Sequence, residues 1–280
     1  MQEKVVVVTG GTSGIGQVAA ERLAAMGARI VLVARSKSRG EAALSRLREI
    51  APTKSHSIHY GDLSRLADLR RVGQEIAAAE TRIDVLLNNA GAMFGNRVVT
   101  EDGFELTFAT NHLSYFVLTH LLKDRLIASA PARVVSTSSH AHYRATLHFD
   151  DLQFERGYEA FPSYCRSKLY NVLFTRALSK RLAGTGVTAN CLHPGFVKTR
   201  FADDSGGGLA RWIKIMKIFA ISQEKGADTL IYLASSDEVR EKSGLYFYKR
   251  KPVAPSKVAQ DDAAAERLWA VTAELAGIQE

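Results

Sequence analysis

The sequence predicts an α/β protein in which helices cover both faces of a parallel sheet, the doubly wound arrangement. Two observations lead to this prediction. Short, continuously apolar segments, typical of strands buried on both faces, alternate with amphipathic segments of helical periodicity along the whole chain. The chain of 280 residues also contains no linker and no internal repeat, so we expect one domain spanning residues 1–280.

The predicted strands and helices alternate along the chain. The strands are expected at residues 5–8, 30–33, 57–60, 85–87, 134–137, 188–192 and 245–248. The helices are expected at residues 15–26, 41–50, 66–79, 104–122, 164–182 and 225–234. Because a helix separates each pair of successive strands, the strands are expected to run parallel. Gly27 follows the first helix, where a terminating glycine is common.

Composition excludes several classes of protein. The apolar fraction of 46% is ordinary for a soluble domain, and no uncharged apolar run reaches the ~18 residues of a membrane span. We see no signal peptide and expect a cytoplasmic protein. Cys165 and Cys191 are too few for a disulfide framework. His140, His142 and His148 lack the spacing of a zinc site, so we expect no metal.

The net charge of +8 raises the question of a polyanionic partner. The basic residues are dispersed, however, and no block of five or more Lys and Arg residues occurs. We therefore expect no nucleic acid as a partner, and a small anionic ligand explains the charge equally well.

A glycine-rich turn lies between the first predicted strand and the first predicted helix. Backbone N–H groups in such a turn, together with the helix N-terminus, can hold a pyrophosphate, as in Rossmann-type folds. The alternative is an ordinary tight strand-to-helix turn. The residues of this turn that we expect to bind a nucleotide are Gly10, Thr12, Ser13, Gly14, Ile15 and Gly16.

The end of the second predicted strand indicates which nucleotide binds. Sites specific for NAD place an acidic residue there to bind the ribose 2′-hydroxyl. This chain has Ala34 near that position, followed by Arg35, whose guanidinium can bind a 2′-phosphate through paired donors. We therefore predict NADP(H) as the cofactor. The alternative is that Arg35 and Lys37 only begin a solvated helix.

Tyr164 and Lys168 stand four residues apart on a predicted helix, so their side chains share one face. A nearby cation favours the phenolate and lowers the pKa of a tyrosine, whose ordinary value of ~10 is too high for proton transfer at neutral pH. The pair therefore predicts an acid/base catalyst. In isolation, an incidental contact on a helix surface is the alternative.

Taken in order, these motifs resemble the short-chain dehydrogenase/reductase family. The resemblance covers essentially the whole chain and looks closest to the retinol-dehydrogenase-like branch. The motifs that carry it are the glycine turn, Asn88-Asn89-Ala90-Gly91, Tyr164-x-x-x-Lys168, His193-Pro194-Gly195, Tyr232-Leu233-Ala234-Ser235, Gly244-Leu245-Tyr246-Phe247 and Arg267-Leu268-Trp269.

The resemblance implies roles for particular residues. Tyr164 matches the acid/base and Lys168 its activator, which also holds the nicotinamide ribose. Asn111 matches an asparagine that holds a water near this lysine. Ser139 matches the serine that binds the reacting oxygen, and Ser138 remains the rival assignment.

The resemblance also implies further cofactor contacts. Asp62 and Leu63 match a pair beside the adenine ring, and Val197 falls where the backbone meets the nicotinamide amide. The segment beside the adenosine ribose corresponds to Asn89, Ala90 and Gly91. Simpler alternatives are a helix N-terminal carboxylate at Asp62 and a plain turn at 88–89.

Two irregular segments, 140–163 and 199–223, follow strands at the edge where ligands of such sheets bind, and we expect them to line a substrate pocket. Aromatic residues in the first segment suggest a lipophilic alcohol, aldehyde or ketone, although each single ring is more often ordinary core. Residues 209–219 form an amphipathic stretch with a basic face. It is either a lid over the substrate or a helix that contacts a membrane surface.

The predicted function is thus an oxidoreductase that uses NADP(H) on a lipophilic alcohol or carbonyl compound. The alternative is a catalytically inactive NADP(H)-binding sensor or scaffold, which loss of the tyrosine, lysine or serine would have favoured. Family members often dimerise through helices matching 104–122 and 164–182, so a homo-oligomer is expected, unless these apolar faces are buried within one chain.

Overall fold

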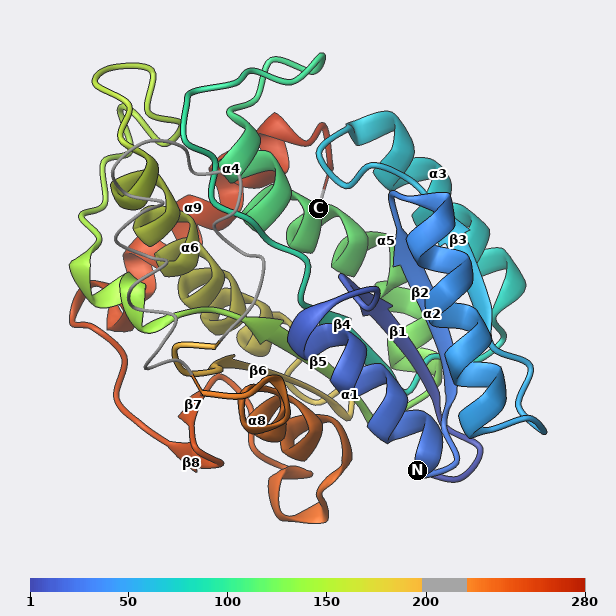
Figure 1. The fold of residues 1–280 in the computed structure, drawn as a ribbon. Coiled ribbons are helices and arrows are strands. Elements are labelled where there is room, and N and C mark those ends of the chain that lie inside the picture. Colours follow the sequence, from blue (N-terminus) through green and yellow to red (C-terminus); the bar gives the residue numbers. More distant parts are fainter. Residues whose placement is uncertain (198–220, 280) are drawn as a thin grey trace.

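The computed structural model describes residues 1–197 and 221–279. In this part of the chain, eight strands form one sheet in the order β3-β2-β1-β4-β5-β6-β7-β8 (Figure 1). The pairs from β3 to β7 are parallel, and β8 is antiparallel to β7. The strands are β1 Val5–Thr9, β2 Arg29–Ala34, β3 Ser57–Tyr60, β4 Val85–Asn88, β5 Ala132–Thr137, β6 Val187–His193, β7 Tyr246–Tyr248 and β8 Lys251–Pro252.

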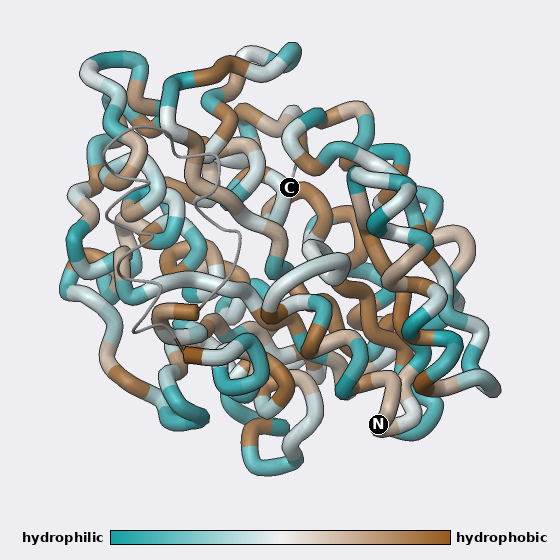
Figure 2. Tube along the Cα trace, in the orientation of Figure 1, coloured by the Kyte–Doolittle hydropathy of each residue, from teal (hydrophilic) through white to brown (hydrophobic). Residues whose placement is uncertain are grey.

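Helices cover both faces of this sheet, as the sequence predicts. They are α1 Gly14–Ala25, α2 Lys37–Ile50, α3 Leu66–Ala79, α4 Leu106–Phe108, α5 Ser114–Ala128, α6 Ala160–Arg181, α8 Gln223–Ser235 and α9 Asp262–Leu275. Successive residues of β1 point to opposite sides. Val6 and Val8 pack in a core with α1, α2 and α8, and Val7 packs in the other core with α3, α5, α6 and α9. Figure 2 shows the hydrophobic residues concentrated along the strands.

The strand order reverses at β1. The chain moves outward from β1 to β2 and β3, and then returns to place β4 on the other side of β1. Ligands of doubly wound sheets bind at such a switch point, outside the carboxyl ends of the strands. Thr9 at the end of β1 and Asn88 at the end of β4 mark this place.

The predicted helix at 104–122 is interrupted in the structure. Its beginning is the short α4, which a π-helical turn over Ala109–Leu113 joins to α5. The sequence pattern also assigned no helix to α9, because much of its apolar face is alanine and its periodicity is weak. It assigned no strand to β8, which has two residues, one of them a proline.

Helix α9 packs against α5 and α6. The Trp269 ring is stacked on Phe174 with centroids 5.7 Å apart and meets Phe116 at 4.7 Å, while the Arg181 guanidinium lies over it at 4.2 Å. Part of the apolar surface considered above for dimerisation is therefore covered within one chain. A homo-oligomer stays a prediction.

No helix among residues 1–197 and 221–279 combines the length and apolar character needed to cross a membrane. Residues 209–219, for which a lid and a membrane-contact helix were both considered, lie outside the described residues.

We predict that Trp269→Ala lowers the free energy of unfolding by about 3–5 kcal/mol, because it leaves a cavity where α9 meets α5 and α6. Urea or guanidinium denaturation would measure this. Glu274→Ala on the exposed side of the same helix is the matched control and should change the value by less than about 0.5 kcal/mol. Equal effects of the two changes would contradict the packing.

Candidate active site

The glycine turn between β1 and α1 needs glycine for two reasons. Gly10 and Gly14 have φ of 66° and 58°, in the left-handed region that side chains disfavour. The turn also approaches the segment after β4 closely. A Cβ on Gly10 would lie 2.9 Å from Ala90 Cα, and one on Gly16 would lie 2.3 Å from Asn89 Nδ2. Larger residues would therefore push the turn away from β4.

The N-terminus of α1 opens at this turn. Its N-cap residue, Ser13, makes no side-chain capping hydrogen bond, and its first turn contains no acidic residue. The backbone N–H groups at the start of α1, together with the positive end of the helix dipole, are suited to an anion such as a pyrophosphate. The glycine turn and the start of α1 therefore fit the dinucleotide that the sequence predicts.

Asn89 and Thr9 tie the turn to β4 and β5. The Thr9 hydroxyl accepts hydrogen bonds from the backbone N–H groups of Asn89 at 2.9 Å and Ala90 at 3.1 Å. The Asn89 amide donates to the Thr9 carbonyl at 3.2 Å and accepts from the Thr137 hydroxyl at 3.1 Å. The structure thus gives the Asn89 side chain a supporting role. The sequence did not reveal that Thr137 supports Asn89, because only the parallel pairing of β4 and β5 brings the two residues together.

Lys168, Asn111 and Gly91 meet at the same edge of the sheet. The buried Lys168 Nζ donates to the Thr137 carbonyl at 3.1 Å. A Cβ on Gly91 would lie 3.2 Å from this Nζ and 3.1 Å from Asn111 Oδ1, so glycine leaves the space beside the lysine open. The Tyr164 ring centroid is 5.6 Å from Nζ. The structure therefore brings together residues from three separate motifs.

Asn111 lies in the π-helical turn, and its side-chain amide is buried and fully used. Oδ1 accepts from Ala92 N at 2.8 Å, while Nδ2 donates to the Ala92 carbonyl at 2.8 Å and to the Ser167 hydroxyl at 3.0 Å. The amide thereby fixes the loop after β4 to α6. Single π turns often occur at functional sites.

The two serines at the end of β5, Ser138 and Ser139, make different contacts. The buried Ser138 hydroxyl donates to the Lys168 carbonyl at 2.7 Å and so anchors α6. Ser139 is partly exposed, and its side chain lies close enough to the Tyr164 phenol to lower the pKa of that phenol. Of the two hydroxyls, that of Ser139 is the one placed beside Tyr164.

Burial governs the ionisation of the pair on α6. It raises the pKa of Tyr164 well above the ordinary value, and the nearby Ser139 side chain offsets this in part. Burial also lowers the pKa of Lys168 to about 7. The raised pKa of Tyr164 is opposite to the direction expected from the charge of Lys168 alone, because desolvation opposes the charged form of both groups.

Arg35 and Asp62 lie together beyond the ends of β2 and β3. Their side chains form an ion pair at 3.7 Å, with the Arg35 side chain 65% exposed. The Asp62 carboxylate also accepts from Ser64 N at 3.0 Å and from the Ser64 hydroxyl at 2.8 Å, which stabilises the turn before α3. Leu63 packs against the core beneath α3.

Val197 lies beside both α1 and α8. It pairs with Ile221 in an isolated parallel bridge. A Cβ on Gly226 would lie 2.5 Å from the Val197 side chain and 2.9 Å from that of Ile15. Val197 is therefore at the edge of the glycine turn, on the side where α8 begins.

The phenylalanines of segment 140–163 divide into two groups. Phe161 packs with Tyr164 and Met93 beside the catalytic candidates. Phe149 and Phe154 instead lie beneath the guanidinium groups of Arg267 and Arg166, at 4.1 and 3.7 Å, and form ordinary packing. In segment 199–223, residues 199–220 lie outside the described part of the chain.

Comparison with known proteins gives consistent matches. The family model for short chain dehydrogenase matches residues 4–207. The chain is 42% identical to retinol dehydrogenase 13 from Homo sapiens over 99% of this chain and 85% of that protein. A crystal structure of an uncharacterized protein from Mycobacterium Paratuberculosis is 33% identical, with a TM-score of 0.80 over 99% and 95% of the two chains.

A further structure is that of Pseudomonas aeruginosa RhlG, solved as a complex with NADP. It is 27% identical to this chain, with a TM-score of 0.69 over 88% of this chain and 94% of that one.

The burial of Lys168 predicts a pH-dependent contribution to stability. Its pKa of about 7 in the folded protein is below the ~10.4 of an unfolded chain, so between these values the unfolded state binds more protons. The free energy of unfolding of the protein without added nucleotide should therefore rise from pH 7 to 10 relative to Lys168→Met. The expected difference is on the order of 1–4 kcal/mol, measured by denaturation at several pH values. Identical pH slopes for the two proteins would contradict it.

Proposed function

Because this chain belongs to the short-chain dehydrogenase family, in its retinol-dehydrogenase-like branch, we propose that it interconverts a lipophilic alcohol and the corresponding aldehyde or ketone with NADP(H). The observation that carries the proposal is the convergence of Ser139, Tyr164 and Lys168 at the carboxyl edge of the sheet, beside a glycine turn that fits a pyrophosphate.

Within this proposal, Tyr164 is the acid/base. In the reduction of a carbonyl compound, the phenol and the Ser139 hydroxyl donate hydrogen bonds to the substrate oxygen, so the negative charge that develops there meets fixed donors. The phenol then transfers its proton and the alcohol forms. In oxidation the phenolate accepts the proton. The nicotinamide, when bound, supplies or accepts the hydride.

Lys168 and Asn111 support this proton transfer. The protonated Lys168 favours the phenolate, and glycine at position 91 keeps a side chain from crowding its ammonium, to which the hydroxyls of a nicotinamide ribose would bind. An anionic cofactor nearby would raise the pKa of Lys168 from about 7, because it favours the charged form. Asn111 holds the loop of Ala92 against α6 and thus fixes the wall beside the lysine.

The preference for NADP(H) rests on Arg35. Its exposed guanidinium follows β2 on the same edge as the glycine turn, and a weak surface ion pair leaves it able to bind a phosphate. The NADP complex of a 27% identical protein shows that a related structure holds this cofactor.

The substrate is proposed to be lipophilic. The Tyr164 phenol is packed among Met93, Ala141, Ala160 and Phe161, which give the reacting centre apolar walls. Relatives with 37% to 42% identity carry the name retinol dehydrogenase, so a retinoid is the first compound to test. A cytoplasmic location stays a prediction, as do the contacts proposed for 209–219.

We predict that Tyr164→Phe lowers kcat about 10²–10⁴-fold on any aldehyde that the protein reduces, because the general acid is lost. Steady-state kinetics would measure kcat, and fluorescence titration would show that NADPH still binds. Tyr115→Phe is the matched control, since Tyr115 is another buried tyrosine whose ring lies 5.8 Å from Lys168 Nζ. Near-normal turnover by Tyr164→Phe would refute the assigned role.

Arg35→Ala should raise the KM for NADPH about 10-fold or more, with little change for NADH, because one charged hydrogen-bond partner of the 2′-phosphate is removed. Initial rates with each cofactor would measure this. Arg46→Ala removes another paired surface guanidinium, which contacts Glu21, and should affect neither cofactor. If the wild-type protein has a lower KM for NADH than for NADPH, the proposed preference for NADP(H) is wrong.

A further inference from the structure

The His142 imidazole uses both ring nitrogens in hydrogen bonds next to Ser139. It lies in the 3₁₀ turn His140–Arg144 after β5, with 0% of its surface exposed. Nδ1 is 2.7 Å from the Ser139 carbonyl oxygen, and Nε2 accepts from Ser256 N at 3.1 Å. Burial lowers the pKa of His142 to about 4, so the ring is neutral near pH 7.

These contacts define the tautomer. A neutral imidazole carries one proton, and a backbone N–H is always a donor. Because Ser256 N donates to Nε2, the proton must lie on Nδ1, where it is donated to the Ser139 carbonyl. The Tyr246 ring meets the imidazole edge-on, at 4.8 Å between centroids and 65° between planes, and this contact restricts rotation of the ring.

We propose that His142 is a positioning residue for Ser139, with Ser256 selecting the tautomer that holds the Ser139 carbonyl. The inference rests on the proposed function, in which the Ser139 hydroxyl binds the reacting oxygen. His142 itself touches neither the substrate nor the cofactor in this proposal.

Ser139 depends on this support because, in the described part of the chain, its carbonyl accepts hydrogen bonds from His142 alone. It has extended angles, φ −158° and ψ 155°, at the junction between β5 and the 3₁₀ turn. Its carbonyl also accepts from His142 N at 3.2 Å, and its hydroxyl accepts from Ala141 N at 3.2 Å. Rotation of the Ser139 peptide would therefore move the hydroxyl away from Tyr164, and the His142 ring opposes that rotation.

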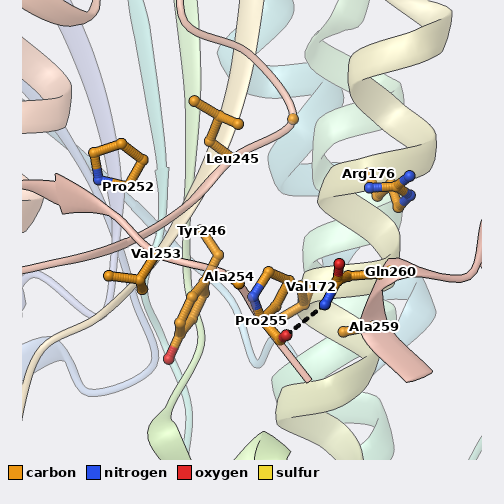
Figure 3. Close-up of a pocket in the computed structure, with 11 residues that line it drawn as sticks. Val172, Arg176, Leu245, Tyr246, Pro252, Val253, Ala254, Pro255, Ala259 and Gln260 are labelled. Atoms are coloured by element: carbon orange, nitrogen blue, oxygen red, sulfur yellow. Dashed lines mark hydrogen bonds between the residues drawn. The ribbon is translucent and has the colours of Figure 1, made fainter. Parts of the chain in front are cut away.

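Ser256, which donates to His142, belongs to a segment that we call the strap, residues 253–256. A second hydrogen bond, from the Tyr143 hydroxyl to the Ala254 carbonyl, joins it to the same 3₁₀ turn. Val253, Ala254 and Pro255 of the strap line a cavity of about 330 Å³, together with Val172 of α6 (Figure 3). Val253 and Ala254 are exposed, so the position of the strap depends largely on its hydrogen bonds, which include one from Val253 N to the Tyr246 carbonyl at 2.9 Å.

The hydrogen bond between the strap and His142 therefore joins two segments that are far apart in the sequence. Ser256 and His142 are separated by 114 residues. Gln260 donates to the Pro255 carbonyl at 2.8 Å, which fixes the strap to the turn before α9 (Figure 3). Through His142, the C-terminal part of the chain thus determines the geometry of a residue at the end of β5.

His142→Phe and His142→Asn test the inference. Phenylalanine fills the site without either hydrogen bond, whereas the asparagine amide can still donate to the Ser139 carbonyl. We expect His142→Phe to lower kcat about 10–100-fold, the effect of losing an orienting partner, with an unchanged Kd for NADPH. Asparagine should restore most of kcat. Val258→Ala, at an exposed position just beyond the strap, is the control and should leave kcat unchanged.

A readout independent of turnover is the tautomer, observed by ¹⁵N NMR of the wild-type protein with labelled histidine and assigned by loss of the signal in a His142 variant. A proton on Nδ1 supports the inference and a proton on Nε2 overturns it. Full kcat in His142→Phe, or no recovery in His142→Asn, also overturns it. If the wild-type protein reduces no carbonyl compound, the proposed function fails, and the tautomer alone decides whether His142 holds the Ser139 carbonyl.

Discussion

The geometry of the candidate active site depends on the attachment of α6 to the end of β5. The Lys168 ammonium donates to the Thr137 carbonyl, and the Ser138 hydroxyl donates to the Lys168 carbonyl, so each element holds the other. The Asn171 amide adds a contact of 3.3 Å to the Thr137 carbonyl. These groups are buried, where a broken hydrogen bond costs more than at the surface. The helix is thereby fixed in rotation, and Tyr164 is presented beside Ser139.

The burial that makes this attachment rigid also opposes the charges that the proposed mechanism requires. It lowers the pKa of Lys168 and raises that of Tyr164. The two effects have one cause, the desolvation of the charged forms. In the proposed mechanism, bound NADP(H) would favour the lysine cation through its negative charge and so compensate for this desolvation. Binding of the cofactor would then activate the phenol, which links nucleotide binding to proton transfer.

Much of the fold and of the candidate site could be predicted from the sequence. Apolar runs located the strands that form the centre of the sheet, and the spacing of Tyr164 and Lys168 placed both side chains on one helical face. The glycine turn was recognisable because its positive φ values and close approach to Ala90 leave no other residue type. These features could be predicted because each depends on residues that are close together in the sequence.

The rest depends on contacts between distant segments. The preference for Ser139 over Ser138 depends on the position of the Lys168 carbonyl, and the proposed role of His142 depends on the strap. The direction of the Tyr164 pKa shift required its burial, which the spacing to Lys168 does not reveal. The π-helical turn at Asn111 is likewise invisible to helical periodicity, because one extra residue changes the register within a continuous apolar pattern.

The most direct test of the account is a stopped-flow measurement of the NADPH absorbance band on mixing the protein and NADPH with lipophilic aldehydes, retinaldehyde first. The account predicts a loss of absorbance that is slower with NADPH deuterated at the transferred position. Tight binding of NADPH with no loss of absorbance across aldehydes and ketones of different length would contradict it, and would favour an inactive NADP(H)-binding protein.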